Sequence, residues 1–294
     1  ERALYNAFLS GLSLSGTKFF YQNRLATSGN YHRQPWYGCA CCPSNVVRVY
    51  PKLGRFVYAH DETNIYVNLY VGGTAKVPLK AGAVTLKQQT RYPWDGRVVL
   101  TVETRRPQAF DLCLRIPGWC REKQTPGGLY RVASAKKDDA KPTLKINGQP
   151  ADVGKLDKGY RRIKRKWTSD DRVELHLPMP IRRIRAHPNV KADKDRIALQ
   201  RGPIVYCVEA VDHGGQVRHL VLGPDAKLKP EHRGDLLGGV TVLTGKANAR
   251  TAGSDKLKQV DLLAIPYYAW DNRSGGEMAV WLAEAARLGR PQPK

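Results

Sequence analysis

Three of the six cysteines lie within four positions, at Cys39, Cys41 and Cys42, and Pro43 follows them directly. Thiolates bind zinc strongly, and a bound zinc ion keeps a thiol deprotonated near neutral pH. Cys42 also lies at a predicted helix start, where the helix dipole and free amides favour a thiolate. The cluster therefore indicates metal or thiol chemistry, and the alternative is a set of buried structural thiols.

The spacing differs from that of a zinc ribbon, which needs two Cys-x-x-Cys pairs. The next cysteines, Cys113 and Cys120, lie far along the chain, in or beside strand-like sequence. Any remaining ligands of a metal at Cys41 and Cys42 must therefore come from elsewhere. None of the seven histidines pairs at a convincing metal-ligand spacing. His32 is the only histidine near the cluster. We expect it to lie in a loop or to contact residues that position the site, rather than to face the pocket.

The elements that would position the cluster are predicted to be helical. Apolar residues recur at four-residue steps from Leu4 to Leu12, which predicts a helix near the start of the chain. Residues 43–45, Pro-Ser-Asn, are typical of a helix start, because proline fits the first turn and serine and asparagine are capping residues. We expect this second helix to run through Tyr50 and to stop before Gly54.

From residue 56 onward the apolar pattern changes to a period of two, which is typical of strands. Short strands with regular turn signals and no helices between them favour antiparallel sandwiches over a parallel α/β sheet. We therefore predict a mainly β protein, with a helical stub over residues 1–56, a β-sandwich over 57–192 and a second β-sandwich over 193–294. The polar, turn-rich segment 121–141 is expected to be an exposed excursion. The predicted strands are 64–71, 83–88, 97–102, 110–116, 143–146, 160–167, 172–177, 204–208, 239–243 and 279–282.

The chain is strongly basic, with 49 Lys and Arg against 26 Asp and Glu and a formal net charge of +23. Such a balance favours nucleic acid, anionic membrane surfaces or acidic glycans as partners. The charge is spread along the chain, however, and isoleucines interrupt its densest runs, 161–166 and 182–185. We interpret these runs as strands with solvated basic faces rather than as a nucleic-acid groove.

No stretch approaches the roughly 18 consecutive apolar residues that a membrane span needs, so the sequence predicts no transmembrane segment. The first residue is Glu1 rather than methionine, and the residues after it are typical of a helix interior. We identify no signal peptide and expect the chain to begin within a longer protein.

The string Cys-Ala-Cys-Cys-Pro-Ser-Asn at residues 39–45 is highly specific. Together with the strings at 1–6, 11–16, 19–23, 66–70, 115–120, 201–203 and 266–273, it resembles the bacterial non-reducing-end β-L-arabinofuranosidase family. Members of that family are zinc-dependent glycoside hydrolases with a cysteine nucleophile. One departure is Arg24, where the family pattern leads us to expect proline; it affects the loop rather than the chemistry.

The resemblance implies an N-terminal (α/α)6 barrel that carries the active site, followed by two β-sandwiches, so that residues 1–56 would form the end of that barrel. It implies that Cys41 is both the nucleophile and a zinc ligand, and that Cys42 is a second ligand. The family's other ligands, a glutamate and a cysteine in a Glu-x-Cys motif, and its acid/base glutamate match nothing here. Glu1 and Tyr21 fall where the family contacts arabinofuranose, and Cys39 is expected to be structural.

The resulting hypothesis is a retaining hydrolase that releases β-L-arabinofuranose from plant-derived arabinofuranosides, in a chain that lacks the acid/base and is inactive alone. A thiolate held by Zn²⁺ would replace the nucleophilic carboxylate of most glycosidases and form a glycosyl-cysteine. The alternatives are a related hydrolase of a different glycoside and a basic β-sandwich binding module with structural zinc. We expect no nucleic-acid or membrane partner and leave a homodimer open. Thiolate–zinc chemistry favours a reducing cytoplasm.

Overall fold

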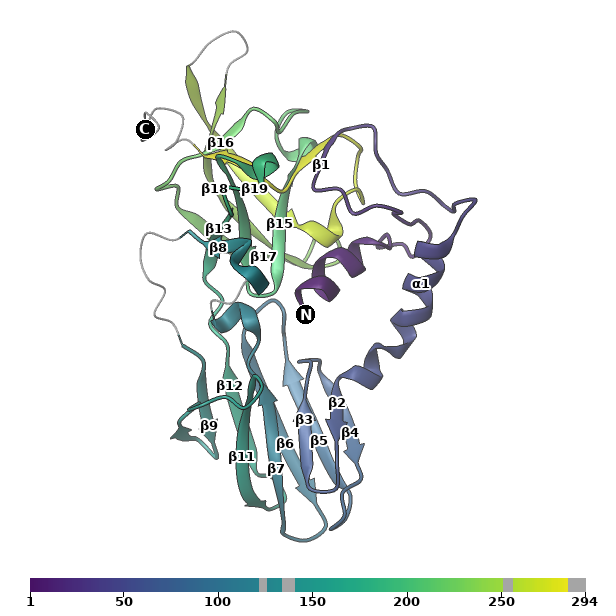
Figure 1. Cartoon of the computed structure of the whole chain (residues 1–294), viewed down its shortest axis with the longest axis vertical. Coiled ribbons are helices and arrows are strands. Elements are labelled where there is room, and N and C mark those ends of the chain that lie inside the picture. Colours follow the sequence, from purple (N-terminus) through teal and green to yellow (C-terminus); the bar gives the residue numbers. More distant parts are fainter. Residues whose placement is uncertain (122–125, 134–140, 251–255, 285–294) are drawn as a thin grey trace. The chain divides into compact units, whose positions relative to one another are not determined.

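The computed structural model describes residues 1–121, 126–133, 141–250 and 256–284 (Figure 1). This part of the chain is mainly β, as predicted, and forms sheets of eleven, six and four strands. The chain divides into two compact units, which are described separately. The first comprises residues 1–47, 124–137 and 180–294, and the second comprises 48–123 and 138–179.

The first unit is built on the eleven-stranded sheet, in the order β1-β20-β15-β19-β18-β16-β21-β14-β13-β8, with β17 beside β18. The pairs are antiparallel apart from the parallel pair β16–β21 in the described residues. Ile197, Tyr206 and Leu243 belong to one core of buried apolar side chains. The strands are β1 (Ala26–Ser28), β8 (Tyr130–Val132), β13 (Ile181–Ala186), β14 (Arg196–Arg201), β15 (Ile204–Glu209), β16 (Leu220–Leu222), β17 (Leu228–Arg233), β18 (Val240–Arg250), β19 (Leu257–Pro266), β20 (Glu277–Ala279) and β21 (Leu282–Glu284).

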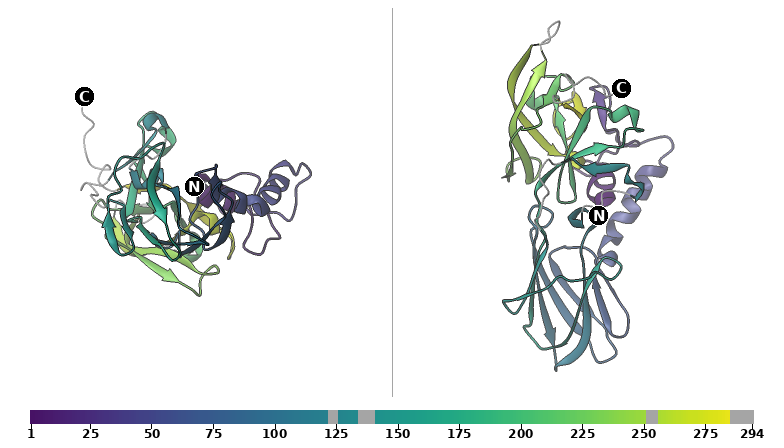
Figure 2. Two further views of the ribbon diagram at one scale, coloured as in Figure 1. Left: turned by 90° about the horizontal axis from the view of Figure 1, so that it is seen from below. Right: turned by 60° about the vertical axis from the view of Figure 1, so that its left-hand side comes forward.

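The second unit is a β-sandwich of a six-stranded sheet, β10-β9-β12-β6-β5-β4, and a four-stranded sheet, β11-β7-β3-β2 (Figure 2). At the start of β7, Gln108 and Phe110 are buried while Ala109 between them is exposed, because alternate side chains of a strand point to opposite faces. The strands are β2 (Tyr58–His60), β3 (Asn64–Val67), β4 (Gly73–Val77), β5 (Val84–Thr90), β6 (Arg97–Thr104), β7 (Gln108–Arg115), β9 (Thr143–Ile146), β10 (Gln149–Ala151), β11 (Tyr160–Trp167) and β12 (Arg172–His176).

Most predicted strands are confirmed, and 143–146 and 160–167 match β9 and β11 residue for residue. β3 ends at Val67, earlier than predicted, because the amides of Asn68 and Leu69 both donate to the carbonyl of Val57 instead of continuing the ladder. β18 extends beyond the predicted strand, because β19 pairs with it along most of its length.

One strand lies in a different unit from the one predicted. β13 hydrogen-bonds to β14, so residues 181–186 belong with the eleven-stranded sheet rather than with the predicted domain 57–192. β8 also joins this sheet from within the predicted excursion 121–141. Residues 122–125 and 134–140 of that excursion lie outside the described residues.

The helix at the cysteines differs from its prediction at both ends. Helix α1 (Cys41–Val49) begins two residues before Pro43. A 3₁₀ helix, η2 (Tyr50–Phe56), follows it directly, so helical structure continues past the predicted end before Gly54. Ser44 does not cap the helix. Its hydroxyl donates to the carbonyl of Ala40 at 2.7 Å, four residues earlier, as a serine inside a helix does.

The predicted first helix is present, and its central turn, Leu4–Phe8, is π-helical. The buried side chains of this helix are polar. The side chain of Asn6 donates to the carbonyl of Pro203 at 2.8 Å and accepts from the amide of Val205 at 2.8 Å. These two bonds fix the helix to the hairpin between β14 and β15, because a buried amide side chain must find partners.

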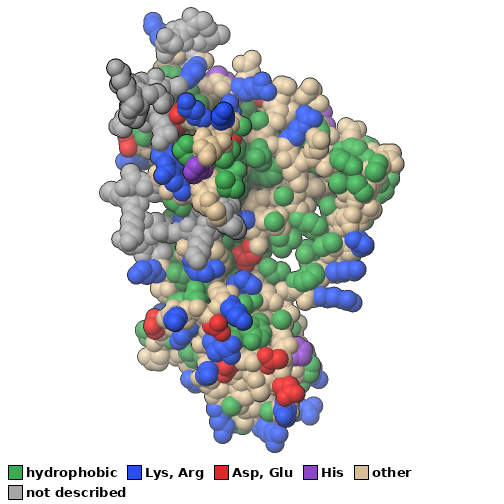
Figure 3. Space-filling view, viewed as in Figure 1, with side chains coloured by type: hydrophobic (Ala, Val, Ile, Leu, Met, Phe, Trp, Pro, Cys, Tyr) green, Lys and Arg blue, Asp and Glu red, His purple; other side chains and the backbone are tan. Residues whose placement is uncertain are grey.

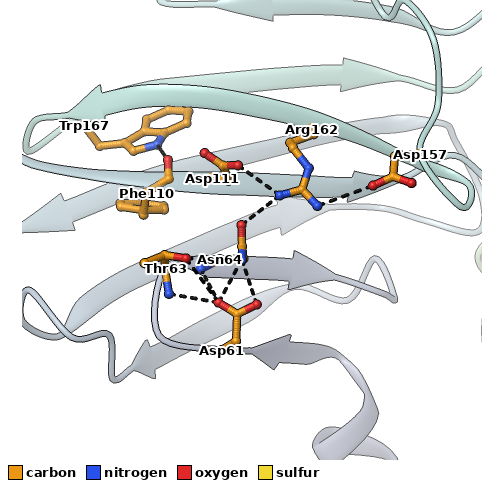
Figure 4. Close-up of polar contacts among 8 residues, drawn as sticks. All are labelled: Asp61, Thr63, Asn64, Phe110, Asp111, Asp157, Arg162 and Trp167. Atoms are coloured by element: carbon orange, nitrogen blue, oxygen red, sulfur yellow. Dashed lines mark hydrogen bonds and ion pairs between the residues drawn. The ribbon is translucent and has the colours of Figure 1, made fainter.

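The first basic run lies on β11 and is partly paired (Figure 4). Arg162 donates to Asn64 at 2.9 Å and to Asp111 at 3.0 Å, and lies 3.4 Å from Asp157. Asn64 in turn donates to both carboxylate oxygens of Asp61. These contacts join three neighbouring elements of the four-stranded sheet. Part of the positive charge of this run therefore pairs with carboxylates of the same unit.

The second basic run lies on β13, and here the prediction of a solvated basic face is wrong. Arg182 is buried. Arg183 donates to the carbonyls of Gly223 and Ala226 at 2.7 and 2.9 Å, and Arg185 pairs with buried Glu284.

Among the described helices, none combines the length and the apolarity needed to cross a membrane.

Candidate active site

The segment that leads to the cysteines is held in the first unit by Arg33, which is 3% exposed. Its guanidinium donates twice to the carbonyl of Ser10, at 3.1 and 2.9 Å, once to that of Tyr268 at 3.1 Å, and once to that of Trp270. Its Cζ atom lies 4.1 Å from the ring centroid of Phe20. One side chain therefore joins three separate parts of this unit.

A group of buried carboxylates completes this anchor. Asp271 accepts from the backbone amide of Arg33 at 2.7 Å and hydrogen-bonds with Nδ1 of His32 at 2.7 Å. The amide of Asp271 donates to Glu209 at 2.8 Å, and Glu209 pairs with Arg273 at 2.6 Å. Burial lowers the pKa of Arg33 to about 10, although the charge of Asp271 opposes this shift. His32 thus lies in the loop and contacts Asp271, in agreement with its predicted supporting role.

The thiol of Cys41 lies at the end of this anchored segment, against an aromatic side chain. The hydroxyl oxygen of Tyr21 is 3.2 Å from Cys41 Sγ, and Cys42 Sγ is 3.8 Å from the same sulfur. The ring of Tyr21 packs against that of Tyr37 with centroids 5.3 Å apart, and Tyr37 donates to the carbonyl of Phe19 at 3.0 Å. The packing of these two rings therefore holds the Tyr21 hydroxyl at the sulfur.

These hydrogen bonds favour the thiolate at Cys41. The pKa of the Cys41 thiol lies below its usual value, chiefly because the Tyr21 hydroxyl and then the Cys42 thiol donate to the sulfur. The same contacts raise the pKa of Cys42 and of Tyr21, since each must keep its proton to donate it. These contacts therefore favour the thiolate at Cys41 over that at Cys42.

The two sulfurs also fit a metal ion. Two thiolates bound to zinc at about 2.3 Å in tetrahedral geometry lie roughly 3.8 Å apart, which is the observed separation of Cys41 and Cys42. The described residues contain no group of three or more histidines, cysteines, aspartates or glutamates that could hold a metal. The described residues thus supply two sulfurs at a separation compatible with zinc.

The remaining thiols divide by burial. Cys39 is exposed like Cys41, which argues against the alternative that the cluster consists of buried structural thiols. Cys113, Cys120 and Cys207 are buried. Burial raises the pKa of Cys113 to about 11 and that of Cys207 well above its usual value. These buried thiols are poorly suited to nucleophilic chemistry.

Glu1 lies in the same unit, half-buried at the start of the first helix, and its carbonyl accepts from the amide of Tyr5 at 2.8 Å. The structure thus brings Tyr21 to Cys41 directly, whereas a role for Glu1 at the sugar stays a prediction. Sequence reasoning missed Arg33 and Asp271 as the residues that position the loop, because their contacts join positions more than 200 residues apart.

Apolar side chains are exposed on the face of the molecule shown in Figure 3. In the segments that lie near the cysteines in the sequence, Trp36 is 55% exposed and Tyr21 39%, and Leu14, Leu25 and Val47 are also exposed. Exposed large apolar side chains are typical of a surface that a ligand or another part of a protein covers.

Comparison with protein families gives three consecutive matches. Residues 1–55 match the family description "Beta-L-arabinofuranosidase, GH127 catalytic domain", where GH127 denotes glycoside hydrolase family 127. Residues 64–179 match the "GH127 middle domain", and residues 181–283 match the "Glycoside hydrolase family 127 C-terminal domain".

Individual proteins give the same result. The chain is 31% identical to the non-reducing end β-L-arabinofuranosidase of Bifidobacterium longum subsp. longum, over 96% of this chain and 44% of that protein. A solved β-arabinofuranosidase of the family superposes with a TM-score of 0.91 at 41% identity, over 99% of this chain and 46% of the other. The β-L-arabinofuranosidase of Geobacillus stearothermophilus T6 gives a TM-score of 0.84 at 40% identity, over 96% and 45%. The chain thus spans less than half the length of each of these relatives.

Proposed function

Because the chain belongs to glycoside hydrolase family 127, we propose that it is part of a retaining β-L-arabinofuranosidase in which Cys41 is the nucleophile. The substrate would be a plant-derived arabinofuranoside, from which the enzyme releases β-L-arabinofuranose. The observation that carries the proposal is the Cys41 sulfur, exposed and 3.2 Å from the Tyr21 hydroxyl, with a pKa below its usual value.

We propose that Cys41 and Cys42 bind a zinc ion, with the remaining ligands supplied from outside the described residues. The support is the 3.8 Å separation of the two sulfurs. When bound, zinc would keep both thiols deprotonated near neutral pH.

The reaction uses Cys41 in place of the carboxylate nucleophile of most glycosidases. The sulfur attacks the anomeric carbon, so that a C–S bond forms as the bond to the leaving oxygen breaks, and a general acid protonates that oxygen. Water then attacks the same carbon from the face opposite the sulfur and gives a proton to the same acid/base group, so that a C–O bond forms as the C–S bond breaks and the thiolate is regenerated. Two inversions at the same carbon retain its configuration.

Tyr21 has two uses in this scheme. Its hydroxyl donates to the Cys41 sulfur and so favours the thiolate in the resting site. During attack the sulfur loses negative charge, and the hydroxyl is then free to donate to the sugar. Tyr21 and, with it, Glu1 are proposed to contact arabinofuranose.

No residue of this chain is assigned as the acid/base. The match to the catalytic domain covers residues 1–55, and the chain spans 44% of the Bifidobacterium relative. We propose that the acid/base glutamate belongs to the part of such enzymes that this chain does not span.

The test is hydrolysis of p-nitrophenyl β-L-arabinofuranoside by the full-length gene product and its cysteine variants. Cys41→Ser is expected to abolish turnover, and Cys42→Ser to lower both turnover and zinc content. Cys39→Ser is the matched control, because Cys39 is exposed in the same loop but has no assigned role. Full activity of Cys41→Ser, or equal losses in all three variants, would refute the assignment.

A further inference from the structure

A pocket lies at one end of the β-sandwich of the second unit, whereas the residues assigned to catalysis belong to the first unit. Val84 of β5 pairs with Val77 of β4 and with Thr104 of β6, so the β4–β5 turn and the β6–β7 turn meet at this end. The turns enclose a pocket of about 740 Å³. This volume is within the range of sites that bind small molecules.

Polar atoms inside this pocket lack partners. Gln108, the first residue of β7, points inward and is only 7% exposed, yet its Oε1 atom accepts no hydrogen bond within the described part of the chain. The hydroxyl of Thr104 at the end of β6 is likewise buried and unpaired there. The Gln108 oxygen faces Gly82, since a Cβ atom built on Gly82 would lie 3.8 Å from it and meet no other atom within 4 Å.

The rim of the pocket is basic. Lys76, Arg105 and Arg106 line it and are exposed, and none of them forms an ion pair with a described carboxylate. The acidic residue of the lining, Glu103, is already paired with Lys87. The pocket therefore combines uncompensated positive charge at its mouth with unpaired acceptor and hydroxyl atoms inside.

We propose that this pocket binds a sugar that carries an anionic group. The Gln108 oxygen can only accept, so its partner must donate a hydrogen bond, as a sugar hydroxyl does and a carboxylate or phosphate does not. The guanidinium groups of Arg105 and Arg106 bind a carboxylate or phosphate. A ligand that satisfies both halves has hydroxyls and an anion in one molecule. This binding site goes beyond the proposed hydrolysis and does not depend on it.

Calorimetric titration of the chain tests the proposal with four probes: trigalacturonate, glucose 6-phosphate, neutral galactotriose and inorganic phosphate. Trigalacturonate or glucose 6-phosphate is expected to bind at one site, at least about tenfold more tightly than galactotriose and inorganic phosphate, because only they engage both halves of the pocket. Which of the two binds more tightly identifies the anion as a carboxylate or a phosphate.

Variants locate the site. Arg105→Ala/Arg106→Ala is expected to weaken binding at least about tenfold, whereas Lys52→Ala/Arg55→Ala should not, although it removes the same charge from exposed residues outside the pocket. Ala83→Glu, which adds a negative charge to the exposed rim, should abolish binding, and its neutral counterpart Ala83→Gln should retain most of it.

Three outcomes would overturn the proposal. They are the absence of binding by both anionic sugars at millimolar concentration, binding of inorganic phosphate as tight as that of the sugars, and equal losses in the pocket and control variants. Gln108→Met adds a test of the interior: binding should fall while the unfolding midpoint stays within the range of the other variants. Unchanged binding by a folded Gln108→Met chain would also contradict the proposal.

Discussion

Replacing Arg33 by methionine is the sharpest structural perturbation of the segment that carries Cys41. The substitution removes the donors to the carbonyls of Ser10 and Tyr268, whereas that of Trp270 keeps a bond from the Asn272 side chain at 3.2 Å. A buried carbonyl that loses its partner costs about 1–3 kcal/mol. Because methionine also removes a buried charge and fills part of the space, we take the lower end of that range at each of the two. With the weaker bonding of Trp270 included, the expected loss of stability is about 2–3 kcal/mol.

The matched control is Arg24→Met. Arg24 is exposed, and its guanidinium carbon lies 4.0 Å over the ring of Tyr31. Such a contact at an exposed site contributes about 0.5–1 kcal/mol, so this variant should lose several times less stability than Arg33→Met.

The assay is urea unfolding followed by tryptophan fluorescence, with hydrogen exchange as a local readout. Trp270 stacks on Phe20 with centroids 4.6 Å apart, so its emission reports on the anchored segment. Arg33→Met should lower the unfolding free energy by about 2–3 kcal/mol and speed exchange over residues 10–37. A loss no larger than that of Arg24→Met would refute the argument that Arg33 holds the segment.

Three further predictions follow from the site and from the sandwich. Tyr21→Phe should slow alkylation of Cys41 by iodoacetamide near neutral pH by about threefold or more, because the thiolate loses its first donor; peptide mass spectrometry follows the peptide that contains Cys41, and an unchanged rate would contradict the prediction. Asn147→Gly should lower stability near neutral pH and make it less dependent on pH. Burial alone would raise the pKa of Asp171, but bonds from Asn147, the Thr168 amide and the Arg165 side chain lower it, so its stabilisation is present above the ordinary carboxyl pKa and is lost as pH falls through the lowered value. The urea midpoint of the variant should therefore lie below that of the parent chain at pH 7, and the two should converge as pH falls toward about 3; identical profiles would argue against this role. Finally, the 294-residue chain alone should not hydrolyse p-nitrophenyl β-L-arabinofuranoside, since it spans 44% of the Bifidobacterium relative; measurable turnover that Cys41→Ser abolishes would place an acid/base within it.

Local sequence patterns were sufficient for strands with clear alternation and pointed to the cysteine loop, but they missed β19. β9 and β11 follow from their alternation of side chains, and the Cys-Ala-Cys-Cys string marks the site because chemistry concentrates at adjacent thiols. The contact of Tyr21 with Cys41 could not be derived from periodicity, since it depends on a loop that returns after 20 residues.

Long-range pairing explains where the predictions from the sequence were wrong or incomplete. The basic run on β13 reads locally as a solvated face, but Arg185 finds buried Glu284, 99 positions away. Asp271 carries no local sign that it binds the Arg33 amide across 238 positions. Such contacts are set by the packing of whole sheets, for which short windows of sequence hold no signal.

The nucleophile can be tested by trapping the covalent intermediate. The full-length gene product is mixed with p-nitrophenyl β-L-arabinofuranoside, quenched in acid during turnover and digested for mass spectrometry. A pentosyl group on the peptide that contains Cys41, absent from the Cys41→Ser protein, is the predicted result. A pentosyl ester on a glutamate or aspartate, with Cys41 unmodified during active turnover, would contradict the account.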